Sequence, residues 1–176
     1  MILVGLGANL SMADGTPPSA TLPRAAGEVA ALPGLRRAAL SRLWDSAPVP
    51  PSDQPRFVNA VLRLEGEAEP APLLAALHAI EARFGRVRGE PNAARTLDLD
   101  LLDLDGAVRG VPPLLPHPRM RLRAFVLAPL AEVAPSWRHP VTGETVEALL
   151  AALPEAERAA CRPLAVPGQS ASGALA

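Results

Sequence analysis

The stretch RTLDLDLLDLDG, which begins at Arg95, constrains the fold more than any other part of the sequence because leucine and aspartate alternate in it. Successive side chains of a β-strand point to opposite faces. Leu97 and Leu99 then share one face, which we expect to be buried. Asp98 and Asp100 share the other face, with roughly 7 Å between them along the strand. The chain must therefore bury one face of a strand here and keep two carboxylates on the other.

Two carboxylates this close repel each other, and a divalent cation between them removes the repulsion. Hard oxygen ligands favour Mg²⁺, which typically takes one or two carboxylates together with substrate phosphates and water. Asp103 and Asp105 have the opposite parity and lie beside the turn residue Gly106, so we expect them to be solvated. An Asp-x-Asp pair by itself is more typical of an edge strand with a solvated face.

The segment RFVNAVLRLEG alternates in the same way and predicts another strand. Its even-numbered residues from 58 to 64 are apolar and should face the core. Phe57 and Asn59 share the opposite face, where a ring beside an amide can stack on and hydrogen-bond a planar heterocycle. A phenylalanine buried under a loop is the alternative. Helical spacing over 21–32 and 71–84 completes an order of elements that predicts an α+β fold, with a sheet and helices packed mainly on one face.

Length and composition set limits on the kind of protein. The 176 residues, 49% of them hydrophobic, suit one folded domain, which we place at residues 1–162 with a flexible tail at 163–176. All 17 basic residues are arginine, and the missing lysine excludes a P-loop. A net charge of −1 gives no reason to expect nucleic acid as a partner. The single cysteine excludes a disulfide framework, and no apolar run approaches the roughly 20 residues of a membrane span, so we expect a cytoplasmic protein.

Arginines gather near the Asp-x-Asp pair. Arg86 and Arg88 lie upstream, and Arg95 precedes Asp98 by three residues. Arginine is the side chain best shaped for bidentate contact with phosphate. Metal-binding carboxylates together with arginines are the combination that phosphoryl transfer requires. Arginines on loops are often only solvated, however. A metal-dependent nucleotide-sugar transferase and a non-catalytic ferredoxin-like ligand- or nucleic-acid-binding module are therefore further readings.

Five segments taken together resemble the 6-hydroxymethyl-7,8-dihydropterin pyrophosphokinases of folate biosynthesis. In order along the chain they are VGLGANL, SDQPRFVNAVLRLE, IEARFGRVR, RTLDLDLL and PHPRMRLRAFVLAPLAEVAP. The resemblance covers roughly residues 1–150 and implies a ferredoxin-like, antiparallel α+β fold and a monomer. It also implies that a pyrophosphoryl group passes from ATP to the hydroxymethyl oxygen of the pterin, leaving AMP.

The resemblance further implies roles for individual residues. Two Mg²⁺ ions would be held by Asp98 and Asp100, which would act in catalysis together with Arg86 and Arg95. The residues implied in ATP binding are Glu81, Arg86, Arg88, Arg95, His117 and Arg123. The residues implied in pterin binding are Ser46, Ala47, Val49, Phe57, Asn59 and Phe125, with the two phenylalanine rings on either side of the heterocycle. By themselves, Glu81 and His117 are more typical of surface residues, and Phe125 is more typical of a core.

The chain departs from the family pattern in the loop before Arg95. Where many members have Trp-Gly-Pro before the arginine, this sequence has Asn92-Ala93-Ala94. A tryptophan that packs over the nucleotide is therefore missing, and the closure of this loop is expected to differ. Phe57 also stands where a tyrosine is common.

Overall fold

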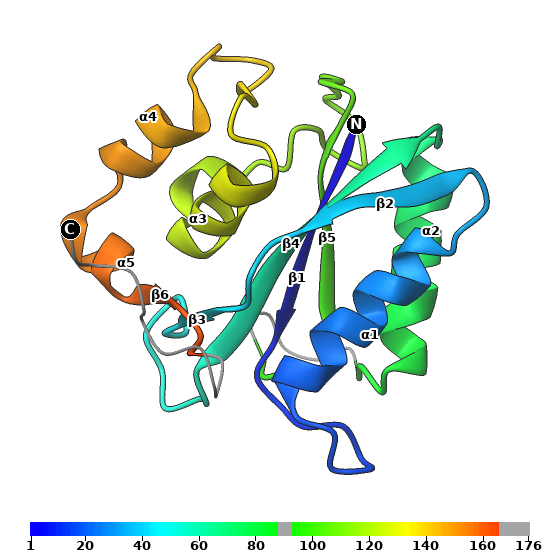
Figure 1. The fold of residues 1–176 in the computed structure, drawn as a ribbon, viewed down its shortest axis with the longest axis vertical. Helices are drawn as coiled ribbons and strands as arrows, with labels where there is room; N and C mark the ends of the chain where they lie inside the picture. The colour runs from blue at the N-terminus through cyan, green and yellow to red at the C-terminus, as the bar shows by residue number, and fades with distance from the viewer. Residues whose placement is uncertain (88–92, 166–176) are drawn as a thin grey trace, which may run out of the picture.

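The structure, a computed structural model, describes residues 1–87 and 93–165. Its strands are β1 (Ile2–Ala8), β2 (Leu35–Leu40), β3 (Trp44–Ser46), β4 (Phe57–Gly66), β5 (Asp98–Leu104) and β6 (Cys161–Pro163). Its α-helices are α1 (Pro18–Ala30), α2 (Pro70–Arg83), α3 (Ala124–Val133), α4 (Val146–Ala152) and α5 (Glu155–Ala159), and a 3₁₀ turn covers Met120–Leu122. Figure 1 shows these elements as one sheet with helices on either side.

The strands form one antiparallel sheet in the order β5-β1-β4-β3-β6, with β2 also paired to β4. β4 is the longest strand and pairs with β1 along one edge and with β2 and β3 along the other. Between β2 and β3 the side chain of Ser41 accepts a hydrogen bond from the backbone N–H of Val61 at 2.9 Å. The antiparallel α+β architecture expected from the sequence is confirmed, and the sheet places β1 between β4 and β5.

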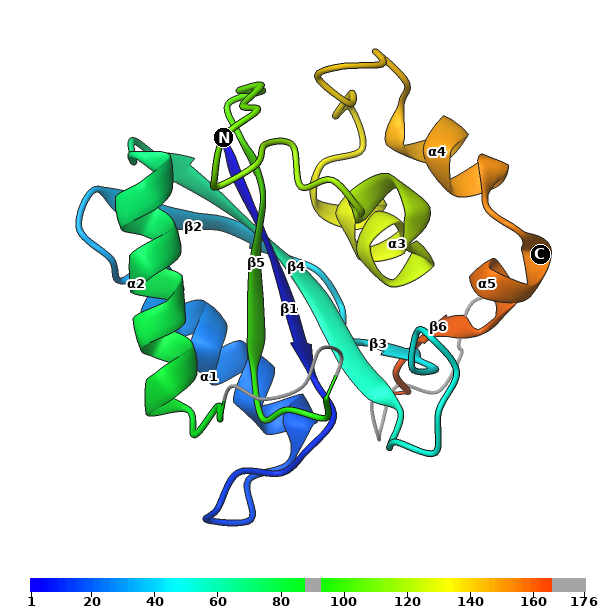
Figure 2. The same ribbon diagram turned by 180° about the vertical axis from the view of Figure 1, so that it is seen from behind.

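The first core lies between the sheet and the two longest helices, α1 and α2 (Figures 1 and 2). Even-numbered residues of β4, among them Leu62 and Leu64, pack there against Leu22 of α1 and Leu77 of α2. The leucines of β5 that alternate with the aspartates, such as Leu99, are buried in the same core. The alternation read from the sequence therefore gives the correct buried face for both strands.

A second core covers part of the opposite face. Leu3, Val61 and Leu102 point to this side and pack with residues of α3 and α4, including Leu127. In Figure 2, α3 and α4 lie across the sheet from α1 and α2. The two longest helices pack on one face as expected, and the shorter α3 and α4 cover part of the other face, where Val61 of β4 is also apolar.

One aspartate of β5 is placed differently from the prediction. β5 contains a bulge, because Val4 pairs with Leu101 whereas Leu3 pairs with Asp103, which leaves Leu102 as an extra residue. Asp103 is only 1% exposed and accepts a hydrogen bond from Trp137 Nε1 at 3.0 Å. The prediction that Asp103 is solvated was wrong, because the bulge turns it toward the second core. Asp105 is exposed in the turn beyond β5, as expected.

The C-terminal part of the described chain returns to the sheet. α4 and α5 are separated by Pro154, and β6 then pairs with β3. Residues 166–176, most of the expected tail, lie outside the described residues. Within the residues that the structure describes, no helix is long and apolar enough to cross a membrane.

Candidate active site

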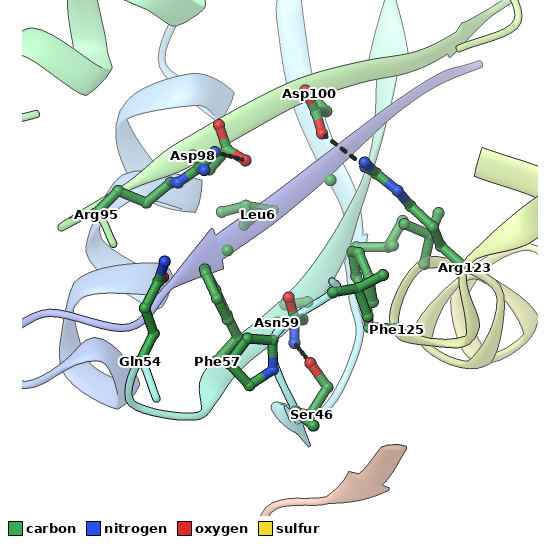
Figure 3. Close-up of a pocket in the computed structure, with 18 of the residues that line it drawn as sticks. Leu6, Ser46, Gln54, Phe57, Asn59, Arg95, Asp98, Asp100, Arg123 and Phe125 are labelled. Carbon is green, nitrogen blue, oxygen red and sulfur yellow. Dashed lines mark hydrogen bonds and ion pairs between the residues drawn. The ribbon is translucent and has the colours of Figure 1, made fainter. Parts of the chain in front are cut away.

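A cavity of about 260 Å³ opens beside α3, on the face of the sheet that carries the second core. Leu3 and Val61 are buried on this face, and other residues that point to the same face of β1, β4 and β5 line the cavity. The residues so placed are Gly5 and Gly7 of β1, Phe57 and Asn59 of β4, and Asp98 and Asp100 of β5. Figure 3 shows an aromatic and amide end and a charged end within this one cavity. The loop after β3 and the beginning of α3 complete its walls.

The aromatic end is built on β4 and β3. Asn59 and Ser46 are 4% and 5% exposed, and Asn59 Nδ2 donates a hydrogen bond to Ser46 Oγ at 2.9 Å. This bond fixes the plane of the Asn59 amide. Phe57 lies two residues before Asn59 on the same face, and Phe125 reaches the cavity from the first turn of α3. Two rings and a fixed amide are suited to a flat heterocycle with polar edges.

Gly7 keeps the floor of the cavity open. A Cβ atom at this position would lie 3.4 Å from Asn59 Oδ1 and 3.9 Å from Asp98 Cβ. Gly7 thus lies between the amide and the carboxylate. A side chain here would extend from the floor into the space between the two ends, and glycine leaves that space open.

Asp98 at the charged end is bound by two arginines. Arg95 Nη1 lies 2.9 Å from Asp98 Oδ2, and Arg86 forms an ion pair with the other carboxylate oxygen. Arg86 is in turn held by Glu81 Oε1 at 2.6 Å and by the backbone oxygen of Leu97 at 3.2 Å. The negative charge of Asp98 is therefore compensated within the protein.

Asp100 has weaker partners. His117 Nε2 and Arg123 Nη1 both lie 3.9 Å from its carboxylate oxygens. Its recessed position raises the pKa of the Asp100 carboxyl above the ordinary value, and the negative charge of Asp98 raises it further. Burial lowers the pKa of His117, although Asp100 opposes this shift. Arg123 also lies over the ring of Phe125 at 5.4 Å, so it bridges the charged and aromatic ends.

Comparisons with known proteins identify the family of this chain. A family model described as 7,8-dihydro-6-hydroxymethylpterin-pyrophosphokinase matches residues 3–135. The chain belongs to this family. It is 44% identical over 154 residues to the 2-amino-4-hydroxy-6-hydroxymethyldihydropteridine pyrophosphokinase of Pseudomonas aeruginosa, a match that covers 87% of this chain and 91% of that one. The enzyme of the same name from Synechocystis is 38% identical over 149 residues, covering 84% and 73%.

Solved structures show the same fold. A Plasmodium falciparum HPPK-DHPS crystallised with pterin and p-hydroxybenzoate has a TM-score of 0.62 at 12% identity, over 85% of this chain and 43% of that chain. Another HPPK-DHPS structure, in complex with substrates, has a TM-score of 0.60 at 11% identity, over 85% and 42%. The ferredoxin-like α+β fold expected from the sequence is confirmed. As a member of the pyrophosphokinase family, the chain is a transferase of folate biosynthesis.

The structure brings most of the predicted site residues of this pyrophosphokinase together. Those that line the cavity are Ser46, Ala47, Val49, Phe57, Asn59, Arg95, Asp98, Asp100, Arg123 and Phe125. Three other predicted residues, Glu81, Arg86 and His117, do not line it. Glu81 is 2% exposed and supports Arg86 and the backbone N–H of Leu99, and His117 lies beside Asp100. Arg88 lies outside the described residues, as does the rest of the loop from 88 to 92.

Several cavity residues were not predicted from the sequence. Gly5 and Gly7 form the floor, and Gln54 belongs to the loop before β4. The two glycines had a usable signal, because they alternate with apolar residues in β1 as Phe57 and Asn59 do in β4. Gln54 carries no such signal, since it lies in an irregular loop whose course depends on the whole fold.

The carboxylates fit a divalent cation. Among the described residues no cluster of three or more His, Cys, Asp or Glu side chains is placed to hold a metal. Asp98 and Asp100 nevertheless offer hard oxygen ligands on one face. The raised pKa of Asp100 also reflects a repulsion that a cation would relieve. Two carboxylates, with phosphate and water as the remaining ligands, are the donor set that Mg²⁺ prefers.

Proposed function

We propose that the cavity binds 6-hydroxymethyl-7,8-dihydropterin at its aromatic end and MgATP at its charged end. The observation that supports this most directly is the shared cavity, in which Phe57, Asn59 and Phe125 face Asp98 and Asp100. Two substrates bound at its two ends would meet near Gly7. The β-phosphorus of ATP would then lie next to the hydroxymethyl oxygen of the pterin.

The aromatic end suits the pterin by size and by chemistry. A volume of about 260 Å³ is near the lower limit for a small-molecule site. It therefore has room for one bicyclic ring at the aromatic end, and most of the ATP molecule would extend out of the cavity beyond the charged end. Phe57 and Phe125 would contact the two faces of the ring, and the Asn59 amide would hydrogen-bond its polar edge. Ser46, Ala47 and Val49 would form the wall along the remaining edge.

At the charged end, Asp98 and Asp100 would hold two Mg²⁺ ions together with the phosphates of ATP. When bound, these ions would neutralise the charge that develops on the phosphate oxygens. The side chains that now lie beside the aspartates would contact ATP instead. They are Arg86, Arg95, His117 and Arg123, with Arg88 joining them. Glu81 would act through Arg86. The exchange of partners keeps every buried charge compensated in both states.

The chain's own residues would perform positioning and charge stabilisation. The pterin hydroxyl would lose its proton to water and form a bond to the β-phosphorus. The bond from that phosphorus to the oxygen that bridges to the α-phosphorus would break, and AMP would leave with that oxygen. No protein nucleophile is needed. The aromatic end would hold the hydroxyl in line with the breaking bond, and the arginines would stabilise the negative charge of the transition state.

The test is an assay for AMP. With Mg²⁺ present, ATP should yield AMP and the pterin diphosphate in equal amounts, and only when the hydroxymethyl pterin is added. Release of ADP, or of AMP without the pterin, would refute the proposal. Binding of both ligands without turnover would indicate a binding module instead. A cytoplasmic location, a monomeric state and the absence of a nucleic-acid partner stay predictions of the sequence.

A further inference from the structure

Asn9 occupies a distinctive position at the end of β1. It directly follows the last residue of the strand and is 4% exposed. β1 lies between β4 and β5 in the sheet, so its backbone joins the strand of the aromatic end to the strand of the charged end. At Asn9 the strand has ended, and the Asn9 amide side chain, not backbone pairing, connects the segments that precede β4 and β5.

Both atoms of the Asn9 amide are used. Oδ1 accepts a hydrogen bond from the backbone N–H of Arg95 at 2.8 Å. Nδ2 donates to the backbone oxygen of Pro55 at 3.1 Å and to Gln54 Oε1 at 3.3 Å. The backbone N–H of Asn9 also donates to the oxygen of Arg95 at 3.0 Å. Asn9 therefore binds both the N–H and the C=O of the Arg95 backbone. Its Nδ2 binds the loop before β4 at the same time.

The two segments joined in this way belong to different ends of the cavity. Arg95 binds Asp98 at the charged end. Pro55 lies two residues before Phe57, and Gln54 lines the cavity wall. The segments before β4 and β5 are both outside the sheet, so no strand pairing fixes one against the other. Among the described residues, the buried side chain of Asn9 contacts both segments.

We propose that Asn9 is a positioning residue that sets the pterin end and the phosphate end at the separation that transfer requires. This inference rests on the proposed function of the two ends. Only a side chain that donates on one side and accepts on the other can make both contacts, and asparagine does so with its short amide. Because the site is buried, a lost partner leaves a polar group unsatisfied, which is more damaging than the loss of an exposed hydrogen bond.

The substitution Asn9→Asp separates the two contacts. Aspartate has nearly the same shape and can still accept from the Arg95 N–H, but it cannot donate to the Pro55 oxygen and repels it. We expect the dissociation constant of the pterin, measured by calorimetry with saturating α,β-methylene-ATP, to rise about tenfold or more. A tenfold change corresponds to about 1.4 kcal/mol. The dissociation constant of α,β-methylene-ATP with Mg²⁺ should change by less than about threefold, because the contact with the Arg95 N–H is kept. Asn9→Ala should weaken both ligands.

Thr21→Val is the matched control. Thr21 is fully buried in α1 on the other face of the sheet, and its hydroxyl donates to the Pro17 oxygen at 3.1 Å. This variant loses a buried hydrogen bond with almost no change of shape, so it should lower stability and leave both dissociation constants unchanged. If Asn9→Asp destabilised the fold as Thr21→Val does and altered neither constant, or altered both equally, Asn9 would be structural only.

A measurement on the unaltered chain covers the case in which the Asn9 variants do not fold. Pterin binding should slow hydrogen exchange at the Arg95 amide, because ordering the loop at Pro55 orders Asn9. An unchanged Arg95 amide on saturation with the pterin would overturn the inference. The two proposals fail differently. If the wild-type chain does not bind the pterin, the proposed function is wrong, whereas binding without a separate effect of Asn9→Asp refutes only the role of Asn9.

Discussion

At the scale of single residues, the two aspartates of the cavity are in unequal environments. Asp98 has two arginine partners in direct contact, whereas Asp100 has a histidine and an arginine at 3.9 Å. Neutralising Asp98 therefore removes the partner of two arginines. Neutralising Asp100 relieves a repulsion that its raised pKa reflects. The same chemical change at the two positions should alter folding stability in opposite directions.

The first prediction concerns catalysis by this pair. Asp98→Asn and Asp100→Asn should each lower kcat by roughly two orders of magnitude or more, because each loses charge neutralisation in the transition state. Without metal, the free energy of unfolding should fall for Asp98→Asn and rise for Asp100→Asn. The measurements are Mg²⁺-dependent AMP release and urea denaturation. Asp105→Asn, in the exposed turn beyond β5, is the control and should keep the wild-type rate. Equal rates for Asp98→Asn and Asp105→Asn would contradict the metal-binding role.

The second prediction concerns pH and Asp103. Burial raises the pKa of its carboxyl above 3.8, although the Trp137 hydrogen bond opposes the shift. The folded chain then holds this proton more tightly than the unfolded chain, so stability is lost as pH rises from the ordinary pKa through the raised one. Asp103→Asn removes that loss. The stability of the variant relative to wild type should increase over this range and level off above it, as urea denaturation at several pH values would show. A difference that falls with pH would be contrary evidence.

Asp103 also shows where sequence reading fails at this scale. Alternation correctly placed Asp98 and Asp100 on the face opposite Leu99, because the strand is regular there. It failed at Asp103 because the bulge adds one residue, and nothing in the local sequence LLDLD marks a bulge. The Asn9 contacts were equally hidden, since its partners are 45 and 86 residues away along the chain.

At the scale of elements, α3 links packing to binding. It begins after Arg123, carries Phe125 in its first turn, and buries Leu127 in the second core. Its sequence, AFVLAPLAEV, is apolar almost throughout. It did not indicate that α3 lies on the opposite face from α1 and α2, because helix periodicity gives a buried side but not the sheet face that it covers. The position of α3 decides where the cavity ends.

The third prediction follows from the place of Phe125 on α3. Phe125→Ala removes one of the two rings and should raise the dissociation constant of the pterin by roughly tenfold, which is about 1.4 kcal/mol. The constant for an ATP analogue should change much less. Calorimetry with each ligand would measure both. Leu122→Ala, an exposed position just before α3, serves as the control. Equal weakening of the two ligands would argue against a stacking role for Phe125.

At the scale of the whole molecule, the sheet separates two cores with different consequences for function. The first core supports the sheet from behind, and the second borders the cavity. The sequence predicted the sheet and the first core from alternation and helical spacing. The second core was missed, because it depends on segments from residue 120 onward folding back over the sheet.

The fourth prediction compares the two cores through matched substitutions. Leu77→Ala in α2 and Leu127→Ala in α3 each remove a fully buried leucine. Each should lower the free energy of unfolding by about 2–5 kcal/mol. Only Leu127→Ala should also weaken pterin binding, because α3 carries Phe125. Urea denaturation and calorimetry on the same two variants make the comparison. An equal loss of pterin affinity in both would show that the cores are not functionally distinct.

The main-chain floor at Gly7 has a consequence for resistance to inhibitors. Resistance commonly arises when a substitution adds bulk where a drug rests and the natural substrate does not. At Gly7 the first added carbon would already lie 3.4 Å from the Asn59 amide oxygen, in the passage between the two ends. Under the proposed function, the substrates need that passage as much as an inhibitor would. A substitution that displaced a compound resting on Gly7 would thus also narrow the passage that the substrates use.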